Sequence, residues 1–220
     1  MSGGREHLEG GLSDEPEIEA EPKILDNFSW VDEKGIRGKE GLTYESVVKY
    51  AQEKDREGVK AVEMDKRKYR TERGERTYDL TKEPEMDEFD KSMNESDKFA
   101  TFVLTVDGEV AAHVFCGKDS ERDNIVELYT VTTMEKYKQN GFMRRLLKSV
   151  EQEAQNVFGA NTIRLSTQEE NDEAVAFYPK VGYVDEGERV QRSGEWKGKS
   201  PYRSIIFVKH LNKQENEPTT

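Results

Sequence analysis

Short runs of apolar residues alternate with polar turns over the second half of the chain. Two of these runs, residues 99–106 and 109–116, flank Asp107-Gly108, a dipeptide that is typical of two-residue turns between antiparallel strands. We therefore predict a β-hairpin there. Further runs rich in β-branched and aromatic residues predict strands at 125–133, 162–166, 184–191 and 202–208.

Helical spacing of apolar residues separates these predicted strands. Beyond the polar turn at 138–141, apolar side chains recur every three or four positions, and Gly159 is suited to end the helix. These positions are Phe142, Leu146, Val150, Ala154 and Val157. A short acidic helix is predicted within 84–97, and another begins at Asn171. This order of elements predicts an α/β (α+β) fold, with helices flanking a mixed, mostly antiparallel central sheet.

The first half of the chain carries weaker patterns. Apolar residues recur at helical intervals between 43 and 57, so a helical lead-in is predicted for residues 41–57. The run at 59–64 predicts a first strand. The next segment, 65–76, holds six basic and three acidic side chains and is interpreted as a solvated hairpin.

Charge is distributed unevenly along the chain. Of its 220 residues, 33% are hydrophobic and 36% are charged, with a formal net charge of −12. Half of that charge lies within residues 1–22, where seven carboxylates stand against Arg5 alone. Because so few apolar groups are present to offset ordering entropy, residues 1–40 are predicted to form an acidic, mostly disordered tail. One folded domain is predicted at 58–212, followed by a polar C-terminal tail at 213–220.

The same charge restricts the partners of this protein. An acidic body disfavours binding to nucleic acid or to an anionic membrane and suits a cationic ligand. The three histidines are far apart and Cys116 is the single cysteine, so we expect neither a metal site nor an intrachain disulfide. The chain has no signal-type segment and no apolar run long enough to span a bilayer, so we expect a cytoplasmic protein.

Two linked segments carry the candidate chemistry. Residues 137–147 run from a strand through a polar turn with one glycine, Gly141, into a helix. The first N–H groups of a helix lack acceptors and its dipole adds partial positive charge, so such a turn suits a phosphate. Residues 171–183 read Asn-Asp-Glu-Ala-Val-Ala-Phe-Tyr-Pro-Lys-Val-Gly-Tyr, which places an amide before a helix and a phenol at its end.

In order and spacing, these segments resemble the acetyl-CoA-dependent N-acetyltransferases of the GNAT superfamily. The turn of that superfamily reads Arg or Gln, two residues, Gly, one residue, then Gly or Ala. Here Lys138 and Met143 stand at the first and last of these marked positions. Lys138 keeps a positive charge without the planar fork of arginine, and Met143 adds bulk. The second segment matches the superfamily at Asn171, Ala174, Phe177, Tyr178, Gly182 and Tyr183.

The resemblance implies a set of residues that bind acetyl-CoA. Backbone N–H groups of the turn would bind its diphosphate, with Lys138 and Arg144 as supplementary charges. The backbone of Val131 and Thr133 would pair with the pantetheine arm as an added strand does. The full implied set is Val131, Thr133, Lys138, Gln139, Asn140, Gly141, Phe142, Met143, Arg144, Asn171 and Tyr178.

Two side chains are candidate catalysts by the same resemblance. Glu127 stands where histone-type members carry a general base, and strand alternation predicts that it shares a face with Tyr129 and Val131. A base is useful because only about one alkylamine in 2,500 is neutral at pH 7, a cost of roughly 4.6 kcal/mol. Tyr178 would protonate the departing thiolate. Each residue also has a plain structural interpretation: a strand glutamate, a packed aromatic and, for Asn171, a helix cap.

These predictions describe an acyltransferase (EC 2.3.1 class) that moves an acetyl group from acetyl-CoA to a primary amine of a small molecule or protein. The amine would attack directly in a ternary complex. We expect a cationic acceptor and consider a homodimer. The alternative is a catalytically weak CoA-binding or protein-interaction module on the same fold, which Lys138 and Met143 favour. Turnover with amines distinguishes the two.

Overall fold

The structure, a computed structural model, describes residues 21–194 and 196–211. Eight strands form one sheet in the order β1-β2-β3-β4-β5-β6-β8-β7, in which only β5 and β6 are parallel neighbours. The strands are β1 (Ile24–Val31), β2 (Thr43–Tyr50), β3 (Phe99–Val106), β4 (Glu109–Lys118), β5 (Ile125–Thr133), β6 (Thr162–Gln168), β7 (Val184–Arg192) and β8 (Tyr202–His210). The predicted class of fold is confirmed.

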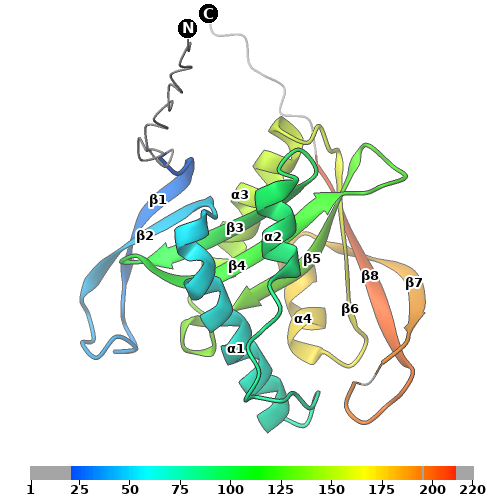
Figure 1. Cartoon of the computed structure of the whole chain (residues 1–220), viewed down its shortest axis with the longest axis horizontal. Coiled ribbons are helices and arrows are strands. Elements are labelled where there is room, and N and C mark those ends of the chain that lie inside the picture. The colour runs from blue at the N-terminus through cyan, green and yellow to red at the C-terminus, as the bar shows by residue number, and fades with distance from the viewer. Residues whose placement is uncertain (1–20, 195, 212–220) are drawn as a thin grey trace, which may run out of the picture.

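Helices cover both faces of this sheet (Figure 1). They are α1 (Arg56–Glu72), α2 (Asp87–Asn94), α3 (Phe142–Asn156) and α4 (Asp172–Phe177), with short 3-10 turns η1 (Glu53–Asp55), η2 (Glu135–Tyr137) and η3 (Tyr178–Val181). One core lies between α3 and the sheet, and a smaller one lies under α1 and α2. In β3, Leu104 joins the first core and Val103 the second, which is the two-residue period of a sheet buried on both faces.

The elements predicted from strong local signals form as expected. β3 and β4 pair around Asp107-Gly108, whose φ angles of 47° and 78° fit the turn type that joins twisted strands. The strand that precedes the glycine turn, the long helix and the last two strands also form. None of the helices in the described part of the chain combines the length and hydropathy that crossing a membrane would require.

The predicted helical lead-in at 41–57 is wrong. Residues Thr43–Tyr50 form β2, which pairs with β1 on one side and β3 on the other, and η1 follows. Thr43 and Glu45 are exposed on one face of this strand, whereas Ser46 and Val48 on the other face are buried, so the two-residue period appears in the burial and not in the spacing of the apolar residues. Pairing on both edges, which a local pattern cannot reveal, decides for the strand.

The predicted strand at 59–64 and hairpin at 65–76 are also wrong. Both segments belong to α1, a helix of 17 residues. Val59 and Val62 lie one turn apart and pack in the smaller core, while the charged residues around them stay at the surface. The basic stretch is therefore the end of a helix, and it contributes directly to the site described below.

Part of the predicted N-terminal tail is an ordered strand. β1 lies within residues 1–40, and its Trp30 packs edge-on against Phe142 of α3 with ring centroids 5.1 Å apart. Arg145 of α3 pairs with Asp26 and lies over the Phe28 ring, 3.6 Å from its centroid. These contacts outweigh the low apolar content that favoured disorder. Residues 1–20 and the predicted C-terminal tail at 213–220 lie outside the described residues.

A nearly buried hydrogen bond joins α1 to β4 and leads to a prediction about acid stability. Glu63 Oε1 lies 2.9 Å from His113 Nε2, and both side chains are nearly buried. Burial alone would raise the pKa of Glu63, but the hydrogen bond with His113 and the charge of Lys66 hold it well below its ordinary value. A lowered carboxyl pKa stabilises the folded state above the unfolded pKa of about 4.3, and that stability is lost as the pH falls.

We therefore expect Glu63→Gln to lower the free energy of unfolding by about 1.5–3 kcal/mol at pH 7 and to flatten its fall between about pH 5 and 3. Urea titrations over this pH range measure both effects. Glu72→Gln removes an exposed carboxylate from the same helix and serves as the control. Equal acid sensitivity of the Glu63→Gln and wild-type proteins would contradict the assignment.

Candidate active site

The parallel strands β5 and β6 diverge in the middle of the sheet. They pair only from Ile125 with Thr162 to Leu128 with Leu165, so the later residues of both strands have no partner across the gap. The strands are parallel because α3 crosses between them, and α3 begins at the wide end of the gap. The fold thus places unpaired strand edges next to a helix N-terminus. Both have backbone groups without hydrogen-bonding partners.

A cavity of about 480 Å³ occupies this opening. Its walls come from α1, the end of β5, the turn before α3, the first turns of α3, and α4. Ten of the twelve predicted site residues line it: Val131, Thr133, Lys138, Gln139, Gly141, Phe142, Met143, Arg144, Asn171 and Tyr178. The structure therefore brings together site residues from 131–144 and from 171–178, which are more than 25 positions apart in the sequence.

The turn before α3 is shaped to receive an anion. α3 begins at Phe142, so the N–H groups of Phe142, Met143 and Arg144 have no acceptor within the helix. Gln139 and Gly141 adopt positive φ angles of 62° and 79°, which curl the backbone around the cavity wall. A Cβ built on Gly141 meets nothing within 4 Å, and Gly141 lines the cavity, so open space adjoins this turn. These features fit a diphosphate.

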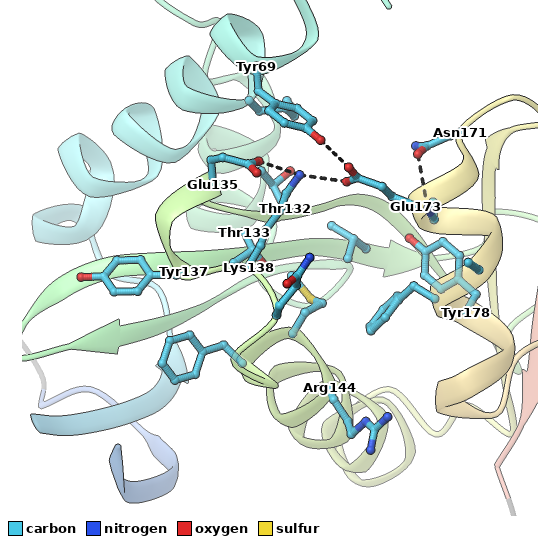
Figure 2. Close-up of a pocket in the computed structure, with 18 of the residues that line it drawn as sticks. Tyr69, Thr132, Thr133, Glu135, Tyr137, Lys138, Arg144, Asn171, Glu173 and Tyr178 are labelled. Atoms are coloured by element: carbon cyan, nitrogen blue, oxygen red, sulfur yellow. Dashed lines mark hydrogen bonds and ion pairs between the residues drawn. The ribbon is translucent and has the colours of Figure 1, made fainter. Parts of the chain in front are cut away.

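Lys138 is engaged by acidic side chains at the mouth of the cavity. Its Nζ lies 2.8 Å from Glu135 Oε2 and 2.9 Å from Glu173 Oε2, and it stands 3.8 Å from the centre of the Tyr69 ring. The Tyr69 hydroxyl donates to the other oxygen of Glu173, so α1 and α4 are linked across the turn (Figure 2). We call Tyr69, Glu135, Lys138 and Glu173 the Lys138 cluster. Burial lowers the pKa of Lys138, but hydrogen bonds to the two carboxylates raise it overall.

Tyr178 forms the opposite wall. α4 ends at Phe177 and η3 begins at Tyr178, directly before Pro179, as predicted for a residue that precedes proline near a helix end. Its ring packs against Phe207 and Tyr183 with centroids 5.4 and 5.7 Å away, and its hydroxyl points into the cavity (Figure 2). Burial raises the pKa of Tyr178, which keeps the phenol protonated at neutral pH, and the charge of Arg70 opposes this effect.

Asn171 serves both as a helix cap and as part of the cavity wall. Its Oδ1 accepts the Ala174 N–H at 3.3 Å, and its Nδ2 donates to Thr167 Oγ1 at 3.3 Å. The cap interpretation of Asn171 is thus confirmed, and the same geometry leaves the residue at the cavity surface.

Glu127 and Asn140 are the two predicted site residues that do not line the cavity. Asn140 Nδ2 donates to the carbonyl oxygens of Tyr137 and Lys138 and so braces the turn from behind. Glu127 pairs with Arg164 of β6 at 3.2 Å. The prediction that Glu127 and Val131 share a face of the strand is wrong. Tyr129 has no partner on β4 and forms a β-bulge, and this extra residue places Glu127 and Val131 on opposite faces of β5.

Several residues of this site carried no recognisable sequence signal. The last turns of α1 supply Asp65, Lys66, Tyr69 and Arg70, and Glu75 follows the helix. This segment is over 60 residues from the glycine turn and was interpreted as a solvated hairpin. Glu173 is a first-turn acid of α4, a position that an acid occupies for helix stability alone, and here it also belongs to the Lys138 cluster. Such residues can be recognised as part of the site only from the tertiary contacts that bring them to it.

Within the described ranges, no group of three or more histidine, cysteine, aspartate or glutamate side chains is arranged to hold a metal ion. The site is defined instead by the turn at the N-terminus of α3, a gap in a sheet and a buried phenol. These features define a class of transferase that takes an extended, phosphate-bearing co-substrate between two strands.

Comparisons with known proteins agree with this class. The model of the acetyltransferase (GNAT) family matches residues 61–183, more than half of the chain. The chain therefore belongs to the GNAT acetyltransferase family. It is an acyltransferase whose co-substrate is acetyl-CoA. Among curated proteins, no sequence matches at a significant level.

Solved structures share this fold at low sequence identity. The ribosomal-protein-S18-alanine N-acetyltransferase of Escherichia coli is 17% identical, with a TM-score of 0.56 over 78% of this chain and 97% of that one. A GNAT-family acetyltransferase of Streptococcus pneumoniae is 22% identical, with a TM-score of 0.58 over 76% and 99%. A mutant spermidine N-acetyltransferase of Vibrio cholerae is 15% identical, with a TM-score of 0.57 over 78% and 96%.

Proposed function

We propose that this enzyme transfers the acetyl group of acetyl-CoA to a primary amine by direct attack in a ternary complex. The observation that carries the proposal is the single cavity in which the glycine turn, the free end of β5 and Tyr178 meet. The diphosphate would lie against the N–H groups of 142–144, and the pantetheine arm along Val131 and Thr133. The thioester would then lie toward Tyr178.

The proposed reaction needs a proton donor near the sulfur. When the amine nitrogen bonds to the carbonyl carbon, the carbon–sulfur bond must break and its electron pair leaves with the CoA sulfur. A phenol at Tyr178 that stays protonated at neutral pH is suited to donate to that thiolate. Direct attack is favoured over a cysteine intermediate because Cys116 is fully buried, and burial raises the pKa of its thiol to about 12.

We further propose that the acceptor is cationic. The net charge of −12 supports this, since it attracts an alkylammonium ion. Proteins of this fold include enzymes whose names specify a polyamine or a protein amine. The role of Glu127 as general base stays a prediction, and so does the formation of a homodimer. Glu127 pairs with Arg164 and does not line the cavity, so the base role requires that the acceptor amine reaches Glu127 outside the cavity.

The test is thiol release from acetyl-CoA with a panel of amines: spermidine, a lysine-rich peptide and a peptide with an N-terminal alanine. We expect release that depends on the amine, an acetylated product in the mass spectrum, and intersecting lines when both substrates are varied. Parallel lines would contradict direct attack. Binding of acetyl-CoA without turnover on the whole panel would favour the alternative, a CoA-binding module.

The Lys138 cluster leads to a separate prediction about affinity. Glu173 holds Lys138 and places a negative charge where the diphosphate is proposed to bind. We expect Glu173→Gln to lower the Kd for acetyl-CoA about threefold at low salt, with a smaller effect at high salt. Calorimetry measures both values.

The matched control for this prediction is Asp172→Asn. Asp172 lies in the same first turn of α4, but its side chain is 90% exposed and it does not line the cavity. An equal change in both variants would assign the effect to the helix dipole or to net charge rather than to Lys138.

A further inference from the structure

Arg70 occupies a distinct position in the cavity wall. It lies near the end of α1 and lines the same cavity as Tyr178, although the two residues are more than 100 positions apart. Its guanidinium stacks on Trp196 of the β7–β8 connection, 5.1 Å from the ring centre. Trp196 is 2% exposed, so the arginine side chain rests against a buried aromatic surface.

The segment that carries Trp196 is fastened to the cavity from two sides. The Lys197 N–H donates to the carbonyl of Glu75 at 2.7 Å, next to the end of α1. The Lys197 ammonium donates to the carbonyl of Glu170 at 2.7 Å, just before α4. Because both anchors border the cavity, the stacked guanidinium is held in one place before any substrate arrives.

The charge of Arg70 is directed at the cavity rather than at a carboxylate. Within residues 21–194 and 196–211, its guanidinium forms no ion pair, whereas the nearby Arg73 pairs with Glu75 at 3.1 Å. Tyr178 lines the same cavity, and the charge of Arg70 opposes the rise that burial causes in the pKa of that phenol. A half-buried cation in the same cavity as a buried phenol favours the anionic form of that phenol.

We propose that Arg70 is a positioning residue for acetyl transfer, which supports Tyr178 as the proton donor and stabilises the negative charge left on the phenol. This inference rests on the proposed function. As the amine nitrogen bonds to the carbonyl carbon and the carbon–sulfur bond breaks, the electron pair stays on sulfur. The Tyr178 proton moves to that sulfur to give the free thiol. The phenolate, held by Arg70, regains a proton that the attacking amine has lost to solvent.

Other charged groups around Tyr178 are arranged differently. Tyr183 contacts its ring from the core side, backed by Glu151 of α3 and Lys209 of β8. Lys180 and Glu75 line the same cavity, the first on η3 and the second after α1. Arg70 differs from these groups because it lines the cavity and is also fixed by its stacking on the buried Trp196 ring.

The first experiment compares Arg70→Gln, Arg70→Lys and the control Arg67→Gln in steady-state kinetics. Arg67 lies on the same helix, stacks on Tyr78 and does not line the cavity. We expect Arg70→Gln to lower kcat roughly tenfold to hundredfold with the Kd for acetyl-CoA nearly unchanged, Arg70→Lys to lose less, and Arg67→Gln to lose nothing. In a Tyr178→Phe background, Arg70→Gln should have almost no further effect. An equal loss in that background would overturn the proposal.

The second experiment reads the coupling without turnover. Tyr178 is replaced by 3,5-difluorotyrosine, a more acidic phenol, and its ionisation is followed by fluorine NMR with and without Arg70→Gln. We expect its pKa to rise by about one unit when Arg70 is removed, and the more acidic phenol to restore part of the lost kcat. An unchanged pKa would overturn the proposal even if Arg70→Gln were inactive. If the wild-type enzyme acetylated no amine, the proposed function would fail while this titration would still decide the role of Arg70.

Discussion

Replacing Tyr178 by phenylalanine is expected to lower kcat about 100-fold while the Kd for acetyl-CoA changes by less than about threefold. The substitution removes only the hydroxyl that faces the cavity, and the ring keeps its packing against Phe177, Tyr183 and Phe207. Without a proton donor, the thiolate must leave unprotonated. Steady-state kinetics with the best acceptor of the amine panel and calorimetry with acetyl-CoA measure the two quantities.

Tyr183→Phe is the matched control for this prediction. Tyr183 is a buried phenol in ring contact with Tyr178, but it does not line the cavity. The Tyr183→Phe enzyme should therefore keep a nearly wild-type kcat. Any loss that it does show measures the general effect of removing a hydroxyl from this core. A Tyr178→Phe enzyme with nearly wild-type kcat would assign the proton to solvent or to another group and would leave Tyr178 a packing residue.

Replacing Gly141 by alanine is expected to raise the Kd for acetyl-CoA about tenfold and to lower the free energy of unfolding by about 1–2 kcal/mol. The stability cost arises because a φ of 79° suits glycine and strains a residue with a Cβ. The binding cost has a different cause, since Gly141 lines the cavity and a new methyl there would take up space next to the proposed diphosphate site.

Gly159→Ala separates these two costs. Gly159 follows the other end of α3, has a φ of 68°, and also leaves room for a Cβ with nothing within 4 Å. It should therefore lose a similar amount of stability without any change in acetyl-CoA binding. Thermal unfolding and calorimetry of both variants provide the comparison. Equal affinities in the two variants would show that the diphosphate lies elsewhere.

The parts of this protein that could be predicted from sequence share a local physical origin. Asp107-Gly108 defines its hairpin because two successive positive φ angles are easy only for such residues. Gly141 and Asn171 lie at the starts of α3 and α4, where helix ends have fixed chemical needs. These short-range signals locate the glycine turn and the start of α4, and the resemblance to the GNAT superfamily adds Tyr178 and the other residues of the predicted site.

The parts that could not be predicted depend on contacts between distant segments. β2 is a strand because β1 and β3 pair with both of its edges. Residues 59–64, taken alone, have the pattern of a strand, but they lie inside the 17-residue helix α1. The bulge at Tyr129 reverses which side chains share a face of β5, and no local rule places it. Tyr69 and Arg70 reach the cavity only because α1 packs across the sheet.

The divergence of β5 and β6 also bears on how the protein avoids unwanted association. Two unpaired strand edges normally invite a further polypeptide strand, and proteins usually protect such edges. Here the edges lie inside the sheet, beneath α4 and the end of α1, in a space of about 480 Å³. A space of this size suits a small molecule rather than a polypeptide chain with its side chains. The width of this space therefore decides which partner can bind. A narrow, linear molecule can hydrogen-bond to the unpaired backbone groups of β5 and β6, whereas a strand of another protein cannot reach them.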